Sequence, residues 1–252
     1  MFSALQAKFL YFPTRELIAS PADAGLEFEN LTIKTGDGVA LHGWWIPAGS
    51  ERGAVIFLHG NAGNISHRIE SYSILRDLGL SVLAIDYRGY GRSEGRPSEN
   101  GTYEDARAAW HWLSRNKGFD KSRIVIVGRS LGGGVASDLA VRVEPAALVL
   151  ESTFTSIRDM AARVFPLPGV ARFATIGYDN FARVQAIRAP KLFIHSPTDQ
   201  VVPFEQGRRL FEVALGPKEF LEISGTHADG FVTSGRVYID GLARFLDRIL
   251  DQ

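Results

Sequence analysis

The sequence predicts an α/β domain built on a mostly parallel sheet, with an antiparallel hairpin at its start. Apolar runs of strand length recur along the chain, segments with helical apolar spacing separate them, and two runs near the start flank a D-G turn. Continuous apolar runs are typical of strands buried on both faces, as in a parallel sheet. Their alternation with helical segments is the pattern of an α/β fold.

The hairpin is predicted from residues 26–34 (LEFENLTIK) and 39–47 (VALHGWWIP), which flank the turn TGDG. Apolar and polar residues alternate partly in both segments, as in strands with one solvated face. A D-G turn between two such segments favours antiparallel pairing.

The remaining strands are predicted from five apolar runs and one more mixed run. These are residues 54–60, 80–89, 123–130, 146–152 and 191–199, with 218–225 as the mixed run. Together with the hairpin they make a sheet of about eight strands. Helical spacing predicts five helices between and after them, at about 66–78, 102–113, 131–141, 203–215 and 231–250. The second is expected to begin near Thr102, where TYED resembles a capping sequence. Helices are therefore expected on both faces.

Composition restricts the class of protein. The chain has 252 residues, of which 45% are hydrophobic and 22% charged, and it is expected to form a single domain, 1–252. Lys+Arg and Asp+Glu are both 28, so the basic excess of a nucleic-acid-binding protein is missing. The absence of cysteine excludes disulfides, a thiol nucleophile and cysteine-bound metal. It is compatible with the expected location, the cytoplasm.

Two segments lie outside the regular alternation. Residues 1–25 are expected to form an N-terminal helical extension in which Phe2, Leu5, Phe9 and Phe12 fall near one helical face. This helix either packs on the domain or makes weak peripheral membrane contact through residues 1–12. Residues 153–190 are too long for an ordinary connection and are expected to form a small lid or a crossover segment.

The motif GRSLGG, residues 128–133, marks the expected reaction centre. The pattern G-x-S-x-G has little specificity alone. Here an apolar strand precedes it and a helical pattern follows, which is the context of a nucleophile elbow. Such a turn presents the Ser130 oxygen above the sheet, so we predict that Ser130 is a nucleophile.

A serine nucleophile needs a base, and the base needs an orienting carboxylate. His227 is the favoured base because its loop follows the last predicted strand, at the edge where an open α/β sheet places its site. Asp199 is favoured as the acid, and Glu151 is the main alternative. Asp86 and Asp229 are weaker options. If Asp199 is the acid, Glu151 is expected to support the site or fix a loop.

The oxyanion formed on acyl attack needs preorganised N–H donors. The backbone N–H of Leu131, directly after the serine, is expected to supply one. The loop HGNAGN, residues 59–64, follows another strand and is expected to supply the second from Asn61. A P-loop role is disfavoured, because this loop lacks the lysine and the spacing.

Five motifs together resemble the α/β-hydrolase fold superfamily: HGNAGN, DYRGYGRSEG, GRSLGG, PTDQVVP and GTHADGF. More narrowly, they resemble the serine-hydrolase branch of abhydrolase-domain proteins with monoacylglycerol-lipase-like or protein-depalmitoylating activity. The resemblance covers nearly the whole chain. It implies Ser130 as nucleophile, Asp199 as acid and His227 as base.

The expected function is hydrolysis of a small or lipid-like carboxylic ester or thioester through an acyl-enzyme, with no metal or organic cofactor. A serine peptidase or an acyltransferase would use the same three residues, so both stay open. A non-catalytic binding protein on this fold is the alternative from another class. Neither the substrate nor the oligomeric state can be read from the sequence.

Overall fold

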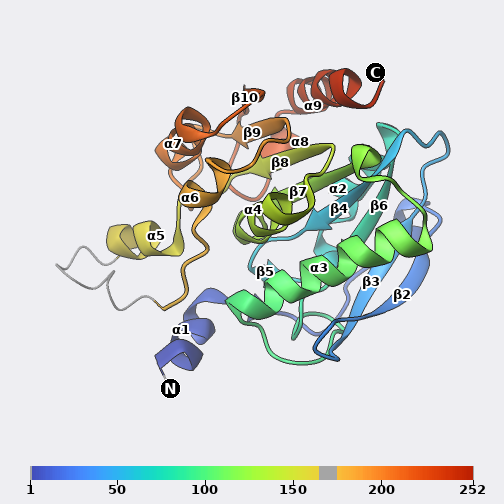
Figure 1. Ribbon diagram of the computed structural model, residues 1–252, viewed down its shortest axis with the longest axis horizontal. Coiled ribbons are helices and arrows are strands. Elements are labelled where there is room, and N and C mark those ends of the chain that lie inside the picture. Colours follow the sequence, from blue (N-terminus) through green and yellow to red (C-terminus); the bar gives the residue numbers. More distant parts are fainter. Residues whose placement is uncertain (1, 165–174, 252) are drawn as a thin grey trace.

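In the computed structural model, which describes residues 2–164 and 175–251, an eight-stranded sheet forms the centre of the molecule (Figure 1). The strand order is β10-β9-β8-β7-β4-β6-β3-β2. The strands are β2 (Glu29–Lys34), β3 (Ala40–Ile46), β4 (Gly53–Leu58), β6 (Leu80–Ile85), β7 (Ile124–Arg129), β8 (Ala147–Glu151), β9 (Lys191–His195) and β10 (Lys218–Glu222).

The predicted hairpin and parallel sheet are both confirmed. β2 pairs antiparallel with β3, and β3 pairs antiparallel with β6. The other neighbouring strands run parallel. β4, β6, β7, β8 and β9 are buried along their whole length, which explains why their sequences are continuous apolar runs rather than alternating ones.

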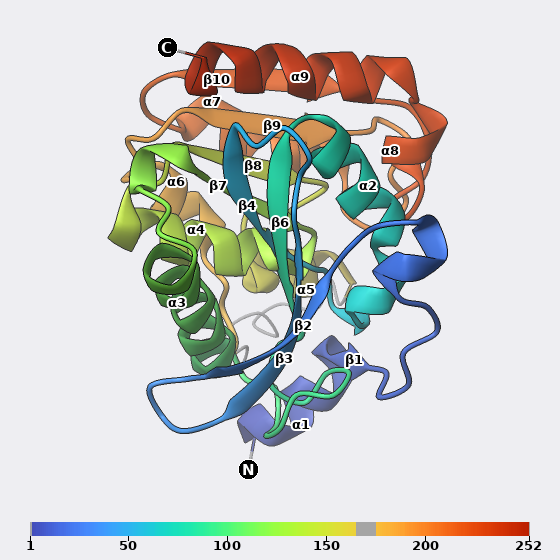
Figure 2. The ribbon, with the colours of Figure 1, turned by 90° about the vertical axis from the view of Figure 1, so that its right-hand side faces the viewer.

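Helices cover both faces of this sheet. The helices of the described residues are α1 (Phe2–Leu10), α2 (Ile69–Asp77), α3 (Glu99–Asn116), α4 (Leu131–Val143), α5 (Ile157–Val164), α6 (Asn180–Val184), α7 (Phe204–Val213), α8 (Gly230–Thr233) and α9 (Arg236–Leu250). Figure 2 shows α3 and α4 on one side of the sheet and α2 on the other. One apolar cluster lies on the side of the sheet that α3 and α4 cover, and it includes Leu113 and Leu139. A second cluster lies on the side that α2 covers, and it includes Tyr72 and Phe245.

Two predicted helices differ from the observed ones. The helix expected from Thr102 begins at Glu99, because the Ser98 side chain accepts the Gly101 N–H at 3.1 Å and caps it. The single helix expected at 231–250 is two helices, α8 and α9. The chain breaks at Gly235, which has φ 47°, a left-handed conformation that glycine adopts without strain.

The N-terminal segment forms a short helix followed by an extended arm. Residues Phe12–Pro13 (β1) pair in parallel with Ala62–Gly63 (β5) in a two-stranded sheet that the sequence did not predict. Ala7 and Leu10 pack against the core, whereas Phe9 and Phe12 are 75% and 52% exposed. No helix among the described residues is long and apolar enough to cross a bilayer. Membrane contact through residues 1–12 stays a prediction.

The expected lid at 153–190 is described only in part, since residues 165–174 lie outside the described residues. The rest contains α5 and α6, and the segment between residues 175 and 180 runs beside α4 to α6 (Figure 1). Tyr178 there is fully buried, and its hydroxyl lies 2.8 Å from those of Tyr11 and Thr102. Whether the whole segment acts as a lid stays a prediction.

Candidate functional site

Ser130 occupies a sharp turn between β7 and α4. Its backbone has φ 53° and ψ −119°, a region that costs a non-glycine residue on the order of 1–3 kcal/mol. The strand next to it holds this turn in place, because the Ser130 N–H donates to the Glu151 carbonyl at 2.9 Å. The Thr153 hydroxyl donates to the Ser130 carbonyl at 2.8 Å. Both the N–H and the carbonyl of Ser130 are thus held by hydrogen bonds.

The two glycines of G-x-S-x-G are required by close packing. A Cβ on Gly132 would overlap the carbonyl oxygen of Leu58, at the end of β4. A Cβ on Gly128 would lie 2.6 Å from the Ala136 Cβ. Strand and helix can therefore meet at this angle only if both positions lack a side chain. The strand–turn–helix context that the motif predicts is present.

His227 and Asp199 extend a hydrogen-bonded chain from Ser130. The His227 Nε2 lies 3.0 Å from the Ser130 Oγ, and its Nδ1 lies 2.7 Å from the Asp199 Oδ2. A carboxylate can only accept, so Nδ1 carries the proton of the neutral ring. Nε2 is then free to accept the Ser130 O–H. The structure thus brings together the three residues that the sequence analysis selected.

Asp199 is held ionised by its surroundings. Burial would raise its pKa, but hydrogen bonds from His195 and His227 outweigh burial and lower the pKa below its usual range. Its Oδ1 also accepts the N–H groups of Val201 and Val202, both at 2.8 Å. These bonds fix the carboxylate and leave Oδ2 facing the His227 ring.

The alternative carboxylates have other partners. Glu151 pairs with Arg129 at 2.8 Å rather than with a histidine. Asp86 lies 3.3 Å from His42 Nδ1 and accepts the Ile65 N–H, on the far side of the 59–64 loop. Asp229 accepts bonds from its neighbour Thr226. None of these contacts reaches His227.

Leu131 and Asn61 lie on the two sides of the serine. Leu131 is the first residue of α4, so its N–H has no acceptor within the helix. A Cβ on Gly60 would lie 3.5 Å from the Ser130 Cβ, which places the 59–64 loop beside the serine. The Asn61 carbonyl accepts from Phe12 N–H and from the Tyr90 hydroxyl. Its side-chain amide donates to the Leu10 carbonyl. These bonds fix the Asn61 peptide without using its N–H.

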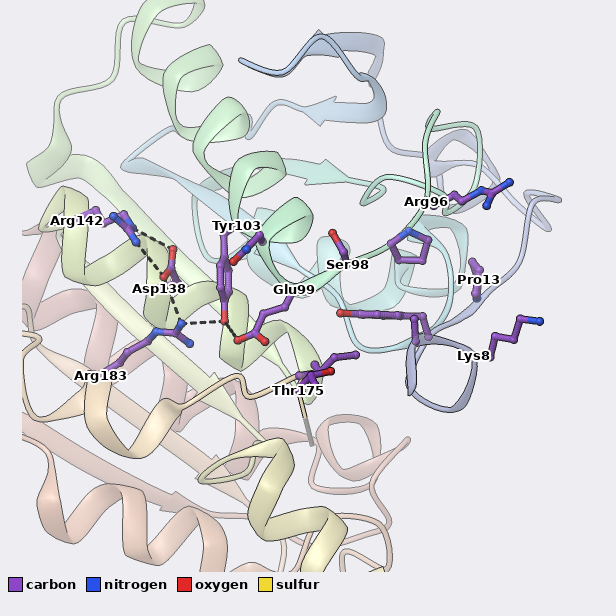
Figure 3. A pocket seen from close by; sticks show the side chains of 15 residues that line it. Lys8, Pro13, Arg96, Ser98, Glu99, Tyr103, Asp138, Arg142, Thr175 and Arg183 are labelled. Atoms are coloured by element: carbon purple, nitrogen blue, oxygen red, sulfur yellow. Dashed lines mark hydrogen bonds and ion pairs between the residues drawn. The ribbon is translucent and has the colours of Figure 1, made fainter. Parts of the chain in front are cut away.

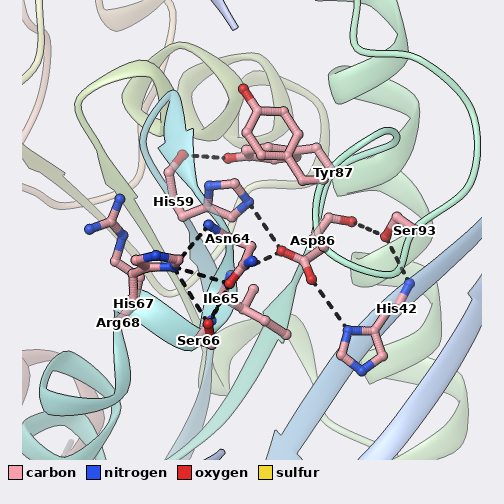
Figure 4. Close-up of polar contacts among 12 residues, drawn as sticks. His42, His59, Asn64, Ile65, Ser66, His67, Arg68, Asp86, Tyr87 and Ser93 are labelled. Carbon is pink, nitrogen blue, oxygen red and sulfur yellow. Dashed lines mark hydrogen bonds and ion pairs between the residues drawn. The ribbon is translucent and has the colours of Figure 1, made fainter. Parts of the chain in front are cut away.

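The 59–64 loop is secured by a buried polar network (Figure 4). Asn64 is fully buried, and its amide donates to the carbonyls of Thr14 and Glu16 at 2.9 and 2.6 Å. The His59 Nδ1 donates to the Gly60 carbonyl at 2.7 Å. Burial lowers the pKa of His59 to about 4, partly offset by Asp86, so this ring is neutral. The extended arm of residues 10–16 is thus part of the loop's support.

One cavity in the described part of the chain is separate from the Ser130–His227–Asp199 group. Its volume is about 990 Å³, and it lies between α1, the start of α3 and the middle of α4. Figure 3 shows Asp138 between Arg142 and Arg183 at one end, and Lys8 and Pro13 at the other. Ser130, Asp199 and His227 are absent from its lining. It therefore does not define an acyl-binding pocket.

Sequence reasoning missed three supports of this site. His195 Nε2 lies 3.4 Å from the Asp199 carboxylate, Asn64 ties the 59–64 loop to the arm, and Arg129 pairs with Glu151. Asn64 lies in HGNAGN and Arg129 in GRSLGG, but neither motif indicates a partner that comes from another segment of the chain. His195 and Asp199 are an i,i+4 pair, and no motif marks their contact.

Comparison with known proteins shows which family the chain belongs to. The profile of the family described as serine aminopeptidase, S33 matches residues 49–180. A Mycobacterium tuberculosis protein that bears no functional name is 40% identical over 96% of this chain and 87% of its own. The chain belongs to this family of α/β hydrolases.

This α/β hydrolase has further relatives in eukaryotes and archaea. The α/β-hydrolase domain-containing protein WAV2 of Arabidopsis thaliana is 36% identical over 97% of this chain and 88% of its own. Among solved structures, the Pyrococcus furiosus esterase Pf2001 superposes with a TM-score of 0.81 and 25% identity. That match covers 95% of this chain and 99% of the esterase. The predicted α/β-hydrolase fold is thereby confirmed, and the protein is a hydrolase of that fold.

Proposed function

We propose that this α/β hydrolase cleaves carboxylic esters or thioesters by way of an acyl-enzyme on Ser130. The observation that carries the proposal is the bond chain Ser130–His227–Asp199, with distances of 3.0 and 2.7 Å. A nucleophile, a base and an orienting carboxylate in contact are what activates a serine hydroxyl.

The reaction proceeds in two steps. His227 Nε2 takes the Ser130 proton while Oγ attacks the carbonyl carbon, and Asp199 stabilises the imidazolium that forms. The N–H groups of Leu131 and Asn61 bind the oxyanion, and removal of one such donor costs about 10²–10³ in rate. His227 then gives its proton to the leaving alcohol or thiol. In the second step it activates a water that releases the acid.

Two other reactions use the same groups. The family description favours a serine peptidase, in which the leaving group is an amine. An acyltransferase would replace water with another acceptor. The name of the Pyrococcus furiosus relative favours ester hydrolysis. We rank the ester or thioester first, because the 25% identical esterase is similar over nearly the full length of both chains.

The test is hydrolysis of p-nitrophenyl esters of rising acyl length, run beside an acyl-CoA thioester and an aminoacyl p-nitroanilide. Wild type and Ser130→Ala are compared. We expect wild type alone to release product from esters or the thioester, and the preferred length then sizes the acyl pocket. Turnover of the anilide alone would make the chain a peptidase.

Two results would overturn the assignment. Equal turnover by wild type and Ser130→Ala would exclude Ser130 as the nucleophile. If no substrate is turned over and a fluorophosphonate does not label Ser130, the chain is a non-catalytic binding protein of this fold.

A further inference from the structure

A buried ion pair lies directly behind Ser130. The side chains of Arg129 and Glu151 are only 7% and 3% exposed. Arg129 Nη2 donates to Glu151 Oε2 at 3.1 Å, and Nε lies 2.8 Å from Oε1 as an ion-pair contact without hydrogen-bond geometry. Arg129 precedes Ser130 in the chain, and the Glu151 carbonyl accepts the Ser130 N–H. The pair therefore adjoins the serine through a peptide bond and through a hydrogen bond.

The same pair contacts the helices that follow His227. The Arg129 guanidinium carbon lies 4.1 Å from the centre of the Phe231 ring in α8. The Tyr238 hydroxyl in α9 donates to Glu151 Oε2 at 3.0 Å. Phe231 and Tyr238 are 8% and 4% exposed, so both contacts are shielded from water. The ion pair thus joins β7 and β8 to α8 and α9.

Stability alone does not call for charges here. Removing two ions from water is costly, and an apolar pair of equal volume is often as stable or more so. A guanidinium is planar, however, and its pairing with a buried carboxylate restricts the orientation of that plane. The Phe231 ring stacked on that plane is then held at a set distance from the serine turn.

Few bonds within its own loop fix the position of the His227 ring. Its loop, residues 225–230, exposes Thr226, Ala228 and Asp229, and Asp229 closes it internally through bonds to Thr226. Apart from Asp199 and a 3.3 Å bond from its N–H to Gln200, the bonds of His227 lead to Ser130. The last residue of this loop, Gly230, is the first residue of α8, and Phe231 of α8 contacts Arg129.

We infer that the Arg129–Glu151 pair is a positioning device that sets the distance between the His227 ring and Ser130. The inference rests on the proposed function, since it assigns His227 as the base. Neither residue touches the substrate. The pair acts through Phe231 and Tyr238, and loosening it is expected to lengthen the His227–Ser130 hydrogen bond.

The experiment uses a triple variant, Arg129→Met/Glu151→Leu/Tyr238→Phe, which removes every polar member together and leaves none unpaired. Its urea midpoint is expected to stay near that of wild type. Its kcat is expected to fall roughly 10- to 100-fold, with KM changed less than about threefold, because a misplaced base slows the chemical step. Amide hydrogen exchange in residues 226–233 is expected to become faster.

Arg88→Met is the control for the single variant Arg129→Met. Arg88 is likewise buried and paired with a buried carboxylate, Asp105, at 2.9 Å. It has no contact with the serine turn or with α8 among the described residues. Both single variants should lose stability, but only Arg129→Met should lower kcat and speed exchange at 226–233. Arg129→Lys keeps the charge without the planar guanidinium that lies over Phe231, and should recover kcat only in part.

The outcomes separate this inference from the proposed function. A folded triple variant with wild-type kcat and wild-type exchange at 226–233 overturns the inference and leaves the proposed function intact. Equal effects in Arg88→Met would also overturn it. If wild type hydrolyses nothing, the exchange measurement decides alone. Faster exchange limited to the Arg129 variants would then support positioning while the proposed function fails.

Discussion

The two loops beside Ser130 are held in opposite ways. The 59–64 loop is supported on several sides, by the buried Asn64 and His59 and by pairing with the N-terminal arm of residues 10–16. In the 225–230 loop, Thr226, Ala228 and Asp229 are exposed, and the Asp229 side chain bonds only within the segment that it closes. The Gly225 carbonyl accepts from the neighbouring Ser196 and Thr198. The proposed oxyanion donor thus lies on a rigid support and the proposed base on a looser one.

The difference fits what each group would do. An oxyanion donor acts only if its N–H already points at the developing charge, so mobility there is costly. A base must accept a proton and then pass it to a leaving group, and a slightly adjustable ring serves both steps. Substitutions in the 59–64 support should therefore lower stability and activity together. Substitutions in the 225–230 loop should affect activity alone.

The largest effect is expected where the 59–64 support meets the serine turn, in Gly132→Ala. The new Cβ would overlap the Leu58 carbonyl and lie 2.7 Å from the His59 carbonyl. Backbone cannot yield as a side chain can, so we expect a loss of more than about 3 kcal/mol in unfolding free energy. Hydrolysis should be abolished. Urea denaturation measures the change in unfolding free energy. Gly36→Ala is the control, because Gly36 has open space around it. A stable, active Gly132→Ala would show that the turn adapts.

Asn64→Ala should come next. It leaves the Thr14 and Glu16 carbonyls without their donor and removes the acceptor of the Ser66 N–H. We expect unfolding free energy to fall by about 3 kcal/mol and kcat to fall with it, as measured by denaturation and ester hydrolysis on the same sample. Asn64→Asp keeps the acceptor but not the donors and should also be destabilised. An Asn64→Ala variant that lost stability but kept kcat would show that the N-terminal arm does not position the oxyanion donor.

Sequence alone predicted more of the site than of its support. Ser130, Asp199 and His227 each follow a recognisable strand, so parallel pairing gathers them at one sheet edge. The break at Gly235 was missed because the helical apolar spacing continues through it. The cap at Ser98 was missed because TYED, near Thr102, also resembles a capping sequence. The Arg129–Glu151 pair and the arm on Asn64 depend on contacts between distant segments, which no local pattern encodes.

The buried His59 gives the supported loop a pH dependence. Burial lowers its pKa from 6.5 to about 4, so the unfolded chain binds a proton in that window and the folded chain does not. Stability contributed by neutral His59 is therefore complete above pH 6.5 and is lost as pH falls toward 4. Between pH 7 and pH 5 the loss is about 2 kcal/mol. Urea denaturation of wild type and His59→Asn at pH 7 and pH 5 isolates the part of this loss that His59 causes. Equal losses in the two proteins would assign the effect to other groups.

Asp229→Ala, in the 225–230 loop, should have the smallest effect on stability and activity. The substitution removes the acceptor of the Thr226 N–H and hydroxyl, bonds of 2.6 and 2.7 Å that close the 225–230 loop. Because these groups are exposed, water replaces the lost bonds and the urea midpoint should not change. The His227 ring should become less well placed, so kcat is expected to fall roughly three- to tenfold with KM unchanged. Asp229→Asn keeps the acceptor oxygen and should retain most of the activity. A fall in stability as large as that of Asn64→Ala would mean that both loops are structural supports, and the contrast between them would be wrong.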